Sequence, residues 1–273
     1  MGIMGRKVTI PDVIGMKGAG EKIVVVTAYD VPFARIFDPL VDIILVGDSL
    51  GMVLYGYDTT LPVTMEDMVR HTRAVTRGRE RSLLVADMPF GSFQVSTEMA
   101  LENACRLVKE GGAEAVKLEG GVKVRPIVEK LTSFGIPVMG HVGLTPQSIH
   151  KMGGYRIQGR GAEARKRLIE DARSIEEGGA FSVVLEGVPS EVAEEITGSL
   201  KIPTIGIGAG AACDGQVLVM HDLLGLSGEF KPKFVKRFAD LTAAVEKAVR
   251  EYASEVRAGT FPGREQSFFL EDK

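Results

Sequence analysis

Polar side chains that could bind a metal ion or move a proton follow several short apolar runs of this sequence. The stretch VDIILVGDSLGMV, residues 41–53, places Asp48 and Ser49 directly after one such run. Asp, Ser and Gly also end strands for local reasons, because they hydrogen-bond their own backbone, so one case indicates only a turn. The pattern recurs after later apolar runs, at Asp87, Glu119, His141 and Glu186.

Asp48, Asp87 and Glu119 together offer hard oxygen ligands. Carboxylate oxygens suit Mg²⁺, whereas no HExxH motif or cysteine cluster indicates zinc. A Mg²⁺ ion with open positions would bind a 2-oxo acid through its carboxylate and keto oxygens, and polarisation of the keto oxygen would make the neighbouring C–H acidic. The residue types therefore predict a site that forms and holds an enolate.

Lys117 lies two residues before Glu119, so both side chains are expected on the same face of a strand. A lysine directed into a protein interior is costly unless an anion pairs with it. Val184 stands at the aligned position of a repeated segment, so packing of this unit does not require a lysine. We expect Lys117 to neutralise the carboxylate of a bound 2-oxo acid.

The elements that must position these residues are predicted to be eight parallel strands. Short β-branched runs alternate with segments of helical charge pattern, which is typical of repeated strand-helix units. The strands are expected at residues 22–30, 42–48, 82–88, 114–120, 136–142, 181–187, 202–208 and 216–222. Eight such strands predict an α/β fold, a (β/α)₈ TIM barrel, whose catalytic residues lie at the carboxyl ends of the strands.

An internal repeat supports this prediction. EGGAEAVKLEG, residues 110–120, aligns without gaps on EGGAFSVVLEG, residues 177–187. The offset corresponds to two strand-helix units of about 33 residues each. Helices are expected in TMEDMVRHTRAVTRG, STEMALENACRLVKEGG and KFVKRFADLTAAVEKAVREYASEV. The first has Thr64 and Asp67 at capping-box spacing. A doubly wound sheet is the alternative fold.

Composition limits the class of protein. The chain has 273 residues, 45% hydrophobic and 25% charged, with a net charge of −3, which indicates a soluble globular protein and argues against nucleic-acid binding. No linker or composition break is present, so one barrel domain is expected over residues 1–273, with a short N-terminal extension and a C-terminal tail. Neither a signal peptide nor a membrane span is indicated. Cys105 and Cys213 form no CxxC pair, and a cytoplasmic location is expected.

Two glycine-rich segments need separate interpretation. GIGAGA, residues 206–211, satisfies a dinucleotide-binding pattern, but the expected next element is a strand rather than a helix, so no nicotinamide site is predicted. We expect this turn to leave space for a folate or to allow tight packing. Residues 143–161, GLTPQSIHKMGGYRIQGRG, could close over the site as a lid or form an ordinary surface loop.

Longer motifs are similar to those of a known family. The chain resembles the ketopantoate hydroxymethyltransferases (3-methyl-2-oxobutanoate hydroxymethyltransferases) from Lys7 to Phe268, in GDSLGMVLYGYDTTLPVTMEDM, VADMPFGSFQ, KLEGG, GHVGLTPQSIHKMGGYRIQGR and GIGAGAACDGQVLVMHDLLG. The resemblance implies a barrel of the phosphoenolpyruvate/pyruvate type. It also implies hydroxymethyl transfer from 5,10-methylenetetrahydrofolate to 3-methyl-2-oxobutanoate through a Mg-stabilised enolate. The product would be 2-dehydropantoate, for pantothenate and coenzyme A synthesis.

Carried over by position, the resemblance implies roles for residues at the strand ends. Mg²⁺ would be held by Asp48, Asp87 and Glu119, directly or through water. The oxo acid would contact Asp48, Ser49, Asp87 and Lys117.

Glu186 matches the family's proton acceptor. Its position after the apolar run FSVVL also favours this role, because a carboxylate in apolar surroundings accepts a proton readily. His141 is expected to orient substrate more than to transfer protons. The resemblance further implies a homo-oligomer, a decamer. The sequence departs from the family at Gln266, where His is expected, and at Ala211, where Pro is common, which puts docking of the C-terminal tail in doubt.

Two other functions compete with this interpretation. A Mg-dependent carbon-carbon lyase or mutase acting on a 2-oxo acid would share the enolate chemistry, but the related barrels commonly use a catalytic cysteine, and Cys105 falls in an expected helix. A noncatalytic ligand-binding barrel would explain a pocket, but it has no reason to keep both Lys117 and Glu186.

Overall fold

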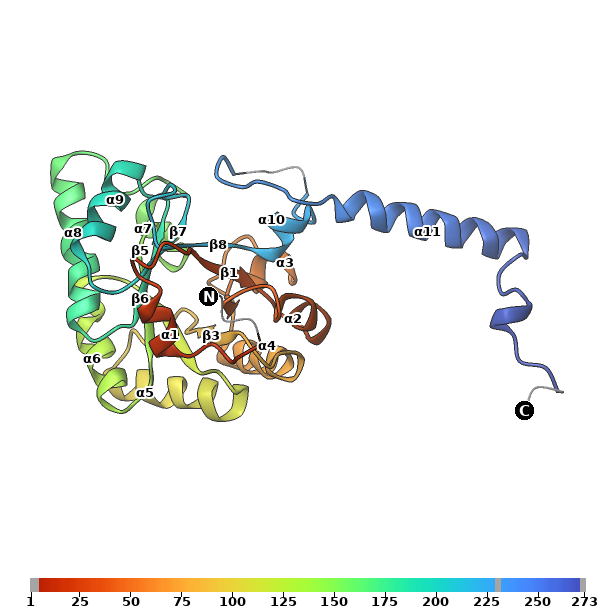
Figure 1. Ribbon diagram of the computed structural model, residues 1–273, viewed down its shortest axis with the longest axis horizontal. Helices are drawn as coiled ribbons and strands as arrows, with labels where there is room; N and C mark the ends of the chain where they lie inside the picture. Colours follow the sequence, from red (N-terminus) through yellow and green to blue (C-terminus); the bar gives the residue numbers. More distant parts are fainter. Residues whose placement is uncertain (1–4, 229–231, 271–273) are drawn as a thin grey trace. The chain divides into compact units, whose positions relative to one another are not determined.

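The computed structural model describes residues 5–228 and 232–270. The chain divides into two compact units, Met1–Met220 and His221–Lys273, and each is described by itself. In the first unit, eight parallel strands pair in chain order, and pairing of the first strand with the eighth closes the barrel (Figure 1). The (β/α)₈ prediction is confirmed, and the doubly wound alternative is wrong. The single-domain expectation stays a prediction.

Each strand overlaps its predicted segment. The strands are β1 Ile23–Thr27, β2 Ile43–Val46, β3 Leu83–Asp87, β4 Ala115–Glu119, β5 Val138–Gly143, β6 Ser182–Glu186, β7 Thr204–Ile207 and β8 Gly215–Leu218. The eighth strand is shorter than predicted, because a helix begins at Met220.

In the first unit, helices connect and surround the strands (Figure 1). Over both units, the helices are α1 Ile10–Gly15, α2 Val31–Phe37, α3 Leu50–Val53, α4 Met65–Gly78, α5 Thr97–Arg106, α6 Arg125–Ser133, α7 Ile149–Met152, α8 Ala162–Glu177, α9 Ser190–Ser199, α10 Met220–Leu224 and α11 Leu241–Ala258. The short helical turns are η1 Leu107–Gly111, η2 Val122–Val124, η3 Pro146–Ser148 and η4 Arg264–Gln266. The predicted capping box of α4 is confirmed, since Thr64 Oγ1 accepts from Asp67 N and Asp67 Oδ2 accepts from Thr64 N.

Every second strand residue points into the barrel, which places one polar layer above an apolar core. The core cluster includes Val85, Ala115, Met139 and Val184. The next positions on the same face of these strands are polar: Asp87, Lys117, Glu119, His141 and Glu186. This alternation agrees with the prediction that Lys117 and Glu119 share a face, and both are buried.

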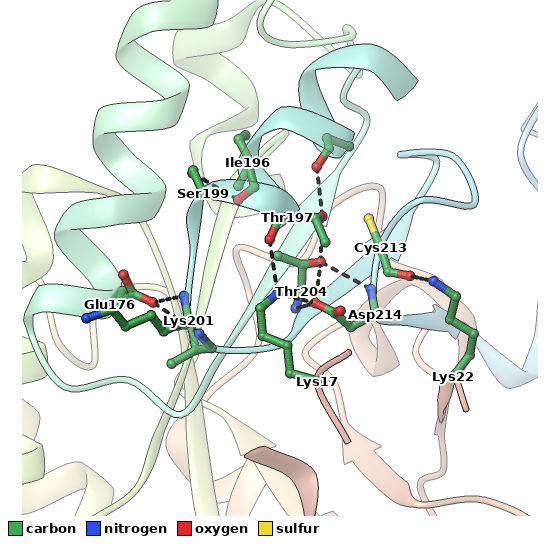
Figure 2. Close-up of polar contacts among 12 residues, drawn as sticks. Lys17, Lys22, Glu176, Ile196, Thr197, Ser199, Lys201, Thr204, Cys213 and Asp214 are labelled. Carbon is green, nitrogen blue, oxygen red and sulfur yellow. Dashed lines mark hydrogen bonds and ion pairs between the residues drawn. The ribbon is translucent and has the colours of Figure 1, made fainter. Parts of the chain in front are cut away.

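The opposite end of the barrel is held by a structural network (Figure 2). Asp214, which precedes β8, accepts through Oδ2 from Lys17 Nζ at 2.8 Å and from the backbone N–H of Thr204 at 2.9 Å. Lys17 Nζ also donates to the carbonyl oxygen of Thr197 on α9 at 3.0 Å. These contacts join the segment after α1 to the starts of two strands, so this cluster has a structural role.

Two predicted segments differ from the structure. Residues 143–161 contain η3 and α7 and are not one continuous loop. In the second unit, α11 begins at Leu241 and not near Lys233, so the longer helix was wrong. The Asp240 side chain accepts from Ala243 N at 3.1 Å and caps the helix there. Within the described residues, no helix is long and apolar enough to cross a membrane.

Candidate active site

The GDS motif brings two carboxylates together just past β2. The backbone N–H of Asp48 donates to Asp87 Oδ2 at 3.0 Å, and both residues are buried. Gly47 leaves the necessary space, because a Cβ there would lie 2.8 Å from Ser49 Oγ and 3.6 Å from Asp87 Oδ2. Ser49 Oγ in turn lies 2.9 Å from the Tyr29 hydroxyl. The motif therefore does more than end a strand.

Lys117 is surrounded by acids. Its Nζ pairs with Asp87 Oδ1 at 2.8 Å and lies 3.3 Å from His141 Nδ1. Burial alone would lower the pKa of Lys117, but Asp87, Glu119 and Asp48 outweigh that effect and raise the pKa, so the amine carries its charge. Because an ammonium can only donate, His141 Nδ1 must be the acceptor.

His141 connects this lysine to Glu186. With Nδ1 accepting, the ring proton is on Nε2, which lies 3.2 Å from Glu186 Oε2. Burial lowers the pKa of His141, and the adjacent Lys117 lowers it further, so the ring is neutral. The Glu186 side chain is 15% exposed, against 4% for His141. Glu186 is therefore the member of this pair that a substrate can reach.

The site holds more negative than positive charge. Burial, and then Asp87, raise the pKa of Asp48 to about 7. Burial and Asp48 also raise the pKa of Glu119 above its ordinary value. A further cation would favour the ionised carboxylates, and hard oxygen ligands suit Mg²⁺. Among residues 5–228 and 232–270, however, no three His, Cys, Asp or Glu side chains form a preassembled metal site. The carboxylates alone would supply only part of the shell of an ion, and the predicted Mg²⁺ site stays a prediction.

The sequence interpretation missed Gln147, a buried residue of η3. Its side-chain Nε2 donates to Asp48 Oδ2 at 2.8 Å and to the Met88 carbonyl oxygen at 3.0 Å. Its backbone N–H donates to Glu119 Oε2 at 3.0 Å. The available signal was its place within GHVGLTPQS, shortly after a strand that ends in the polar layer.

Tyr155 was also missed. Its hydroxyl donates to Met52 Sδ at 3.4 Å, so Tyr155 contacts α3, the helix that follows the GDS motif. Partial burial raises the pKa of Tyr155, and the charges of Glu186 and Asp48 raise it further, although the residue is 54% exposed. One residue of the segment expected to act as a lid therefore lies within electrostatic range of the carboxylates. Its closure over bound substrate stays a prediction.

The remaining sequence predictions concern residues outside this cluster. GIGAGA ends β7 and leads into β8 with no helix between them, as expected. Cys105 lies on α5, and both Cys105 and Cys213 are free thiols. Gln266 lies in η4 of the second unit, and Ala211 lies in the turn between β7 and β8. The positions of these two residues do not test the expected docking of the C-terminal tail.

Solved structures share this fold. A phosphonopyruvate hydrolase aligns with a TM-score of 0.61 at 12% identity, covering 96% of this chain and 92% of that one. A 2,3-dimethylmalate lyase, described as a member of the PEP mutase/isocitrate lyase superfamily, aligns with a TM-score of 0.59 at 17% identity, covering 97% and 91%. At these identities the likenesses show the (β/α)₈ fold alone, and the phosphoenolpyruvate/pyruvate type of barrel stays a prediction.

Sequence relatives carry more information. A protein of Geobacter metallireducens named 3-methyl-2-oxobutanoate hydroxymethyltransferase is 58% identical over 266 residues, which cover 97% of this chain and 100% of that protein. A protein of the same name from Heliobacterium modesticaldum is 53% identical over 271 residues, covering 99% and 98%. The family model described as ketopantoate hydroxymethyltransferase matches residues 7–264. With this match over nearly its whole length, the chain belongs to the ketopantoate hydroxymethyltransferase family.

Proposed function

We propose that the protein transfers a hydroxymethyl group from 5,10-methylenetetrahydrofolate to 3-methyl-2-oxobutanoate, giving 2-dehydropantoate for pantothenate and coenzyme A synthesis. Family membership makes the chain a hydroxymethyltransferase, and the names of its relatives support this acceptor. The lyase or mutase alternative has only the shared barrel in its favour, at 12% and 17% identity.

The proposal depends above all on one chain of contacts, from Asp87 through Lys117 and His141 to Glu186. Within this chain of contacts, the Lys117 ammonium could pair with the carboxylate of the oxo acid. The carboxylate that could accept a proton is Glu186, which lies beyond His141. In the proposed reaction, Glu186 accepts the proton from C3 of the oxo acid. His141 would help to hold Glu186 in position through the 3.2 Å contact between its Nε2 and Glu186 Oε2.

The buried acids provide the complementary half of the site. Asp48 and Asp87 would hold Mg²⁺, with Glu119 bound directly or through water, and Ser49 would contact the oxo acid. A bound Mg²⁺ would act as a Lewis acid that polarises the 2-keto oxygen and so acidifies the C3–H bond. The support for this assignment is the excess of buried negative charge, seen in the raised pKa values of Asp48 and Glu119.

The proposed transfer balances with one water. C3 loses a proton to Glu186 and forms a bond to the methylene carbon of the folate, whose bonds to nitrogen break. Water supplies the hydroxyl of the new hydroxymethyl group, the second proton of this water and the proton held by Glu186 go to the two folate nitrogens, and tetrahydrofolate leaves. Tyr155, close to the acids and in contact with Met52, would help to keep other water away from the reacting carbon.

Replacement of Glu186 tests the proposed base. Glu186→Gln keeps the shape of the side chain and loses its basicity. We expect near-normal binding of oxo acid, while C3 deuterium exchange and hydroxymethyl transfer fall together by about two to four orders of magnitude. Proton NMR of 3-methyl-2-oxobutanoate in D₂O, with and without Mg²⁺ and tetrahydrofolate, measures the exchange. Glu194→Gln, an exposed change on α9, is the matched control. Normal exchange with lost transfer would assign proton removal to another group, with His141 the next candidate.

Replacement of the acids tests the metal assignment. Asp48→Asn and Asp87→Asn each remove a hard anionic ligand, so we expect weaker Mg²⁺ binding in titration calorimetry and loss of turnover in a folded protein. Glu102→Gln removes the same charge from an exposed position on α5 and should leave Mg²⁺ binding unchanged. Full activity of either Asn variant at limiting Mg²⁺ would contradict the assignment.

We further propose that the enzyme works in the cytoplasm as a homo-oligomer, the decamer expected from the family. Free Cys105 and Cys213 suit a reducing compartment.

A further inference from the structure

Two glutamine side chains from separate connections form a path that leads to the buried acids. Gln94 lies in the exposed connection between β3 and α5, and Gln147 lies in η3 after β5. Gln94 Nε2 donates to Gln147 Oε1 at 3.2 Å. Gln147 Nε2 donates to Asp48 Oδ2 at 2.8 Å. The path therefore runs from the protein surface to a carboxylate of the proposed metal site.

Each amide in this path has a defined direction. The backbone N–H of Gly91 donates to Gln94 Oε1 at 2.7 Å, and that of Phe93 donates to the same oxygen at 3.4 Å. With its oxygen engaged, Gln94 turns its nitrogen toward Gln147. Gln147 then accepts through Oε1 and must direct its own nitrogen at Asp48.

The opposite orientation of Gln147 is unfavourable for a second reason. Its Nε2 also donates to the Met88 carbonyl oxygen at 3.0 Å. An exchange of nitrogen and oxygen would place an amide oxygen against both the Asp48 carboxylate and this carbonyl, and acceptors repel one another. The network thus determines which end of the amide faces the acid.

We propose that Gln94 and Gln147 form a positioning relay that orients Asp48 for its ligands. Gln147 occupies Oδ2 of Asp48 and so directs Oδ1 at an incoming cation or oxo acid. The backbone N–H of Gln147 holds Glu119 Oε2 at the same time. The relay limits the rotation of carboxylates from two strand ends before a ligand arrives, which lowers the entropy lost on binding. This inference rests on the proposed role of Asp48 in Mg²⁺ binding.

A substitution of the exposed Gln94 tests the relay without replacing a buried residue. Gln94→Glu has almost the same shape, but it replaces the donor that faces Gln147 Oε1 with an acceptor. The Gln147 amide then faces acceptors at both ends, so it should lose its fixed orientation and its hold on Asp48. We expect the dissociation constant for Mg²⁺, from titration calorimetry with 3-methyl-2-oxobutanoate and no folate, to rise by about 10- to 100-fold. An added carboxylate would by itself attract the cation, so weaker binding cannot come from the charge change.

Two control variants separate the relay from general effects. Gln94→Ala removes the donor without reversing it, so it should weaken Mg²⁺ binding less than Gln94→Glu. Gln216→Glu adds the same charge at an exposed position on β8 and should leave the dissociation constant unchanged. Thermal unfolding of each variant checks that the fold is kept.

A double-mutant cycle tests the order of the relay. If Gln94 acts through Gln147, Gln94→Ala should have no further effect on Mg²⁺ binding in a Gln147→Ala protein. Additive effects, or normal Mg²⁺ binding by Gln94→Glu, would overturn the relay and leave the proposed function intact. Absence of Mg²⁺ binding by the wild-type protein, with and without the oxo acid, would instead refute the metal role of Asp48, and the relay with it.

Discussion

Lys117 shows how one side chain can serve both the stability and the chemistry of a site. Its ammonium pairs with Asp87 at 2.8 Å and donates to His141, and both partners are buried. Without a bound metal ion, this charge offsets part of the repulsion among the carboxylates. With the oxo acid present, the same ammonium is placed to meet the carboxylate of that substrate.

Lys117→Met should therefore have two effects. Loss of the charge should abolish measurable binding of 3-methyl-2-oxobutanoate in titration calorimetry, while the remaining apolar stem keeps the packing. Leaving Asp87 buried without its partner should also lower the free energy of unfolding by about 3–5 kcal/mol, measured by urea denaturation. Lys123→Met, an exposed change in η2, should alter neither quantity. If oxo acid affinity were kept while Mg²⁺ binding collapsed, Lys117 would act by supporting the metal ligands.

At the scale of elements, Asp38 fixes the connection that leads into β3, the strand that ends in Asp87. Its carboxylate follows α2 and accepts from the backbone N–H groups of Glu80, Arg81 and Ser82 at 2.8 to 3.0 Å. Burial would raise the pKa of Asp38, but these hydrogen bonds outweigh it and hold the pKa below its ordinary value of 3.8. The ionised carboxylate therefore stabilises the fold.

Asp38→Ala should lower the free energy of unfolding near neutral pH by about 2–4 kcal/mol, because the buried N–H of Ser82 and the part-buried N–H groups of Glu80 and Arg81 lose a charged acceptor. Since folding depresses this pKa, the stabilisation is present above pH 3.8. It is lost as the pH falls through the lower pKa of the folded state. The wild-type protein should thus lose more stability on acidification than the variant. Urea unfolding of both proteins between neutral and acid pH measures the difference, and parallel curves would contradict it.

At the scale of the whole molecule, α11 carries an apolar face that the other described residues of the second unit leave largely exposed. Val245, Val249, Tyr252 and Val256 follow helical spacing along one face, and each is between 45% and 58% exposed. No residue of this helix is buried. An exposed apolar face of this kind is typical of a protein interface, and we propose that a second copy of the chain covers it.

Val249→Glu should place a charge in that interface and shift the assembly toward smaller species, because an unpaired buried charge is unfavourable. Sedimentation velocity or light scattering after gel filtration measures the mass. Ser254→Glu adds the same charge on another face of α11 and should leave the mass unchanged. An unchanged mass for Val249→Glu would remove α11 from the interface.

The fold and most of the polar layer could be predicted from the sequence, because the relevant signals are local. Period-two alternation and β-branched runs are enough to predict each strand, and residues two apart, such as Lys117 and Glu119, share a face in any strand. A polar residue at a strand end is also a local feature, so Asp87 and Glu186 could be chosen as candidates before the strands were arranged in space. The start of α11 was missed, although Asp240 is a local capping signal.

How these groups face one another depends on the closed barrel and could not be predicted from local patterns. Gln147 reaches Asp48, 99 residues earlier in the chain, because barrel closure brings the ends of β2 and β5 to the same face. The contact between Tyr155 and Met52 has the same origin. The neutral form of His141 and the place of its proton follow from Lys117 on one side and Glu186 on the other. Such contacts form between side chains from separate connections that meet over a closed barrel. Local sequence patterns do not predict contacts between residues so far apart in the chain.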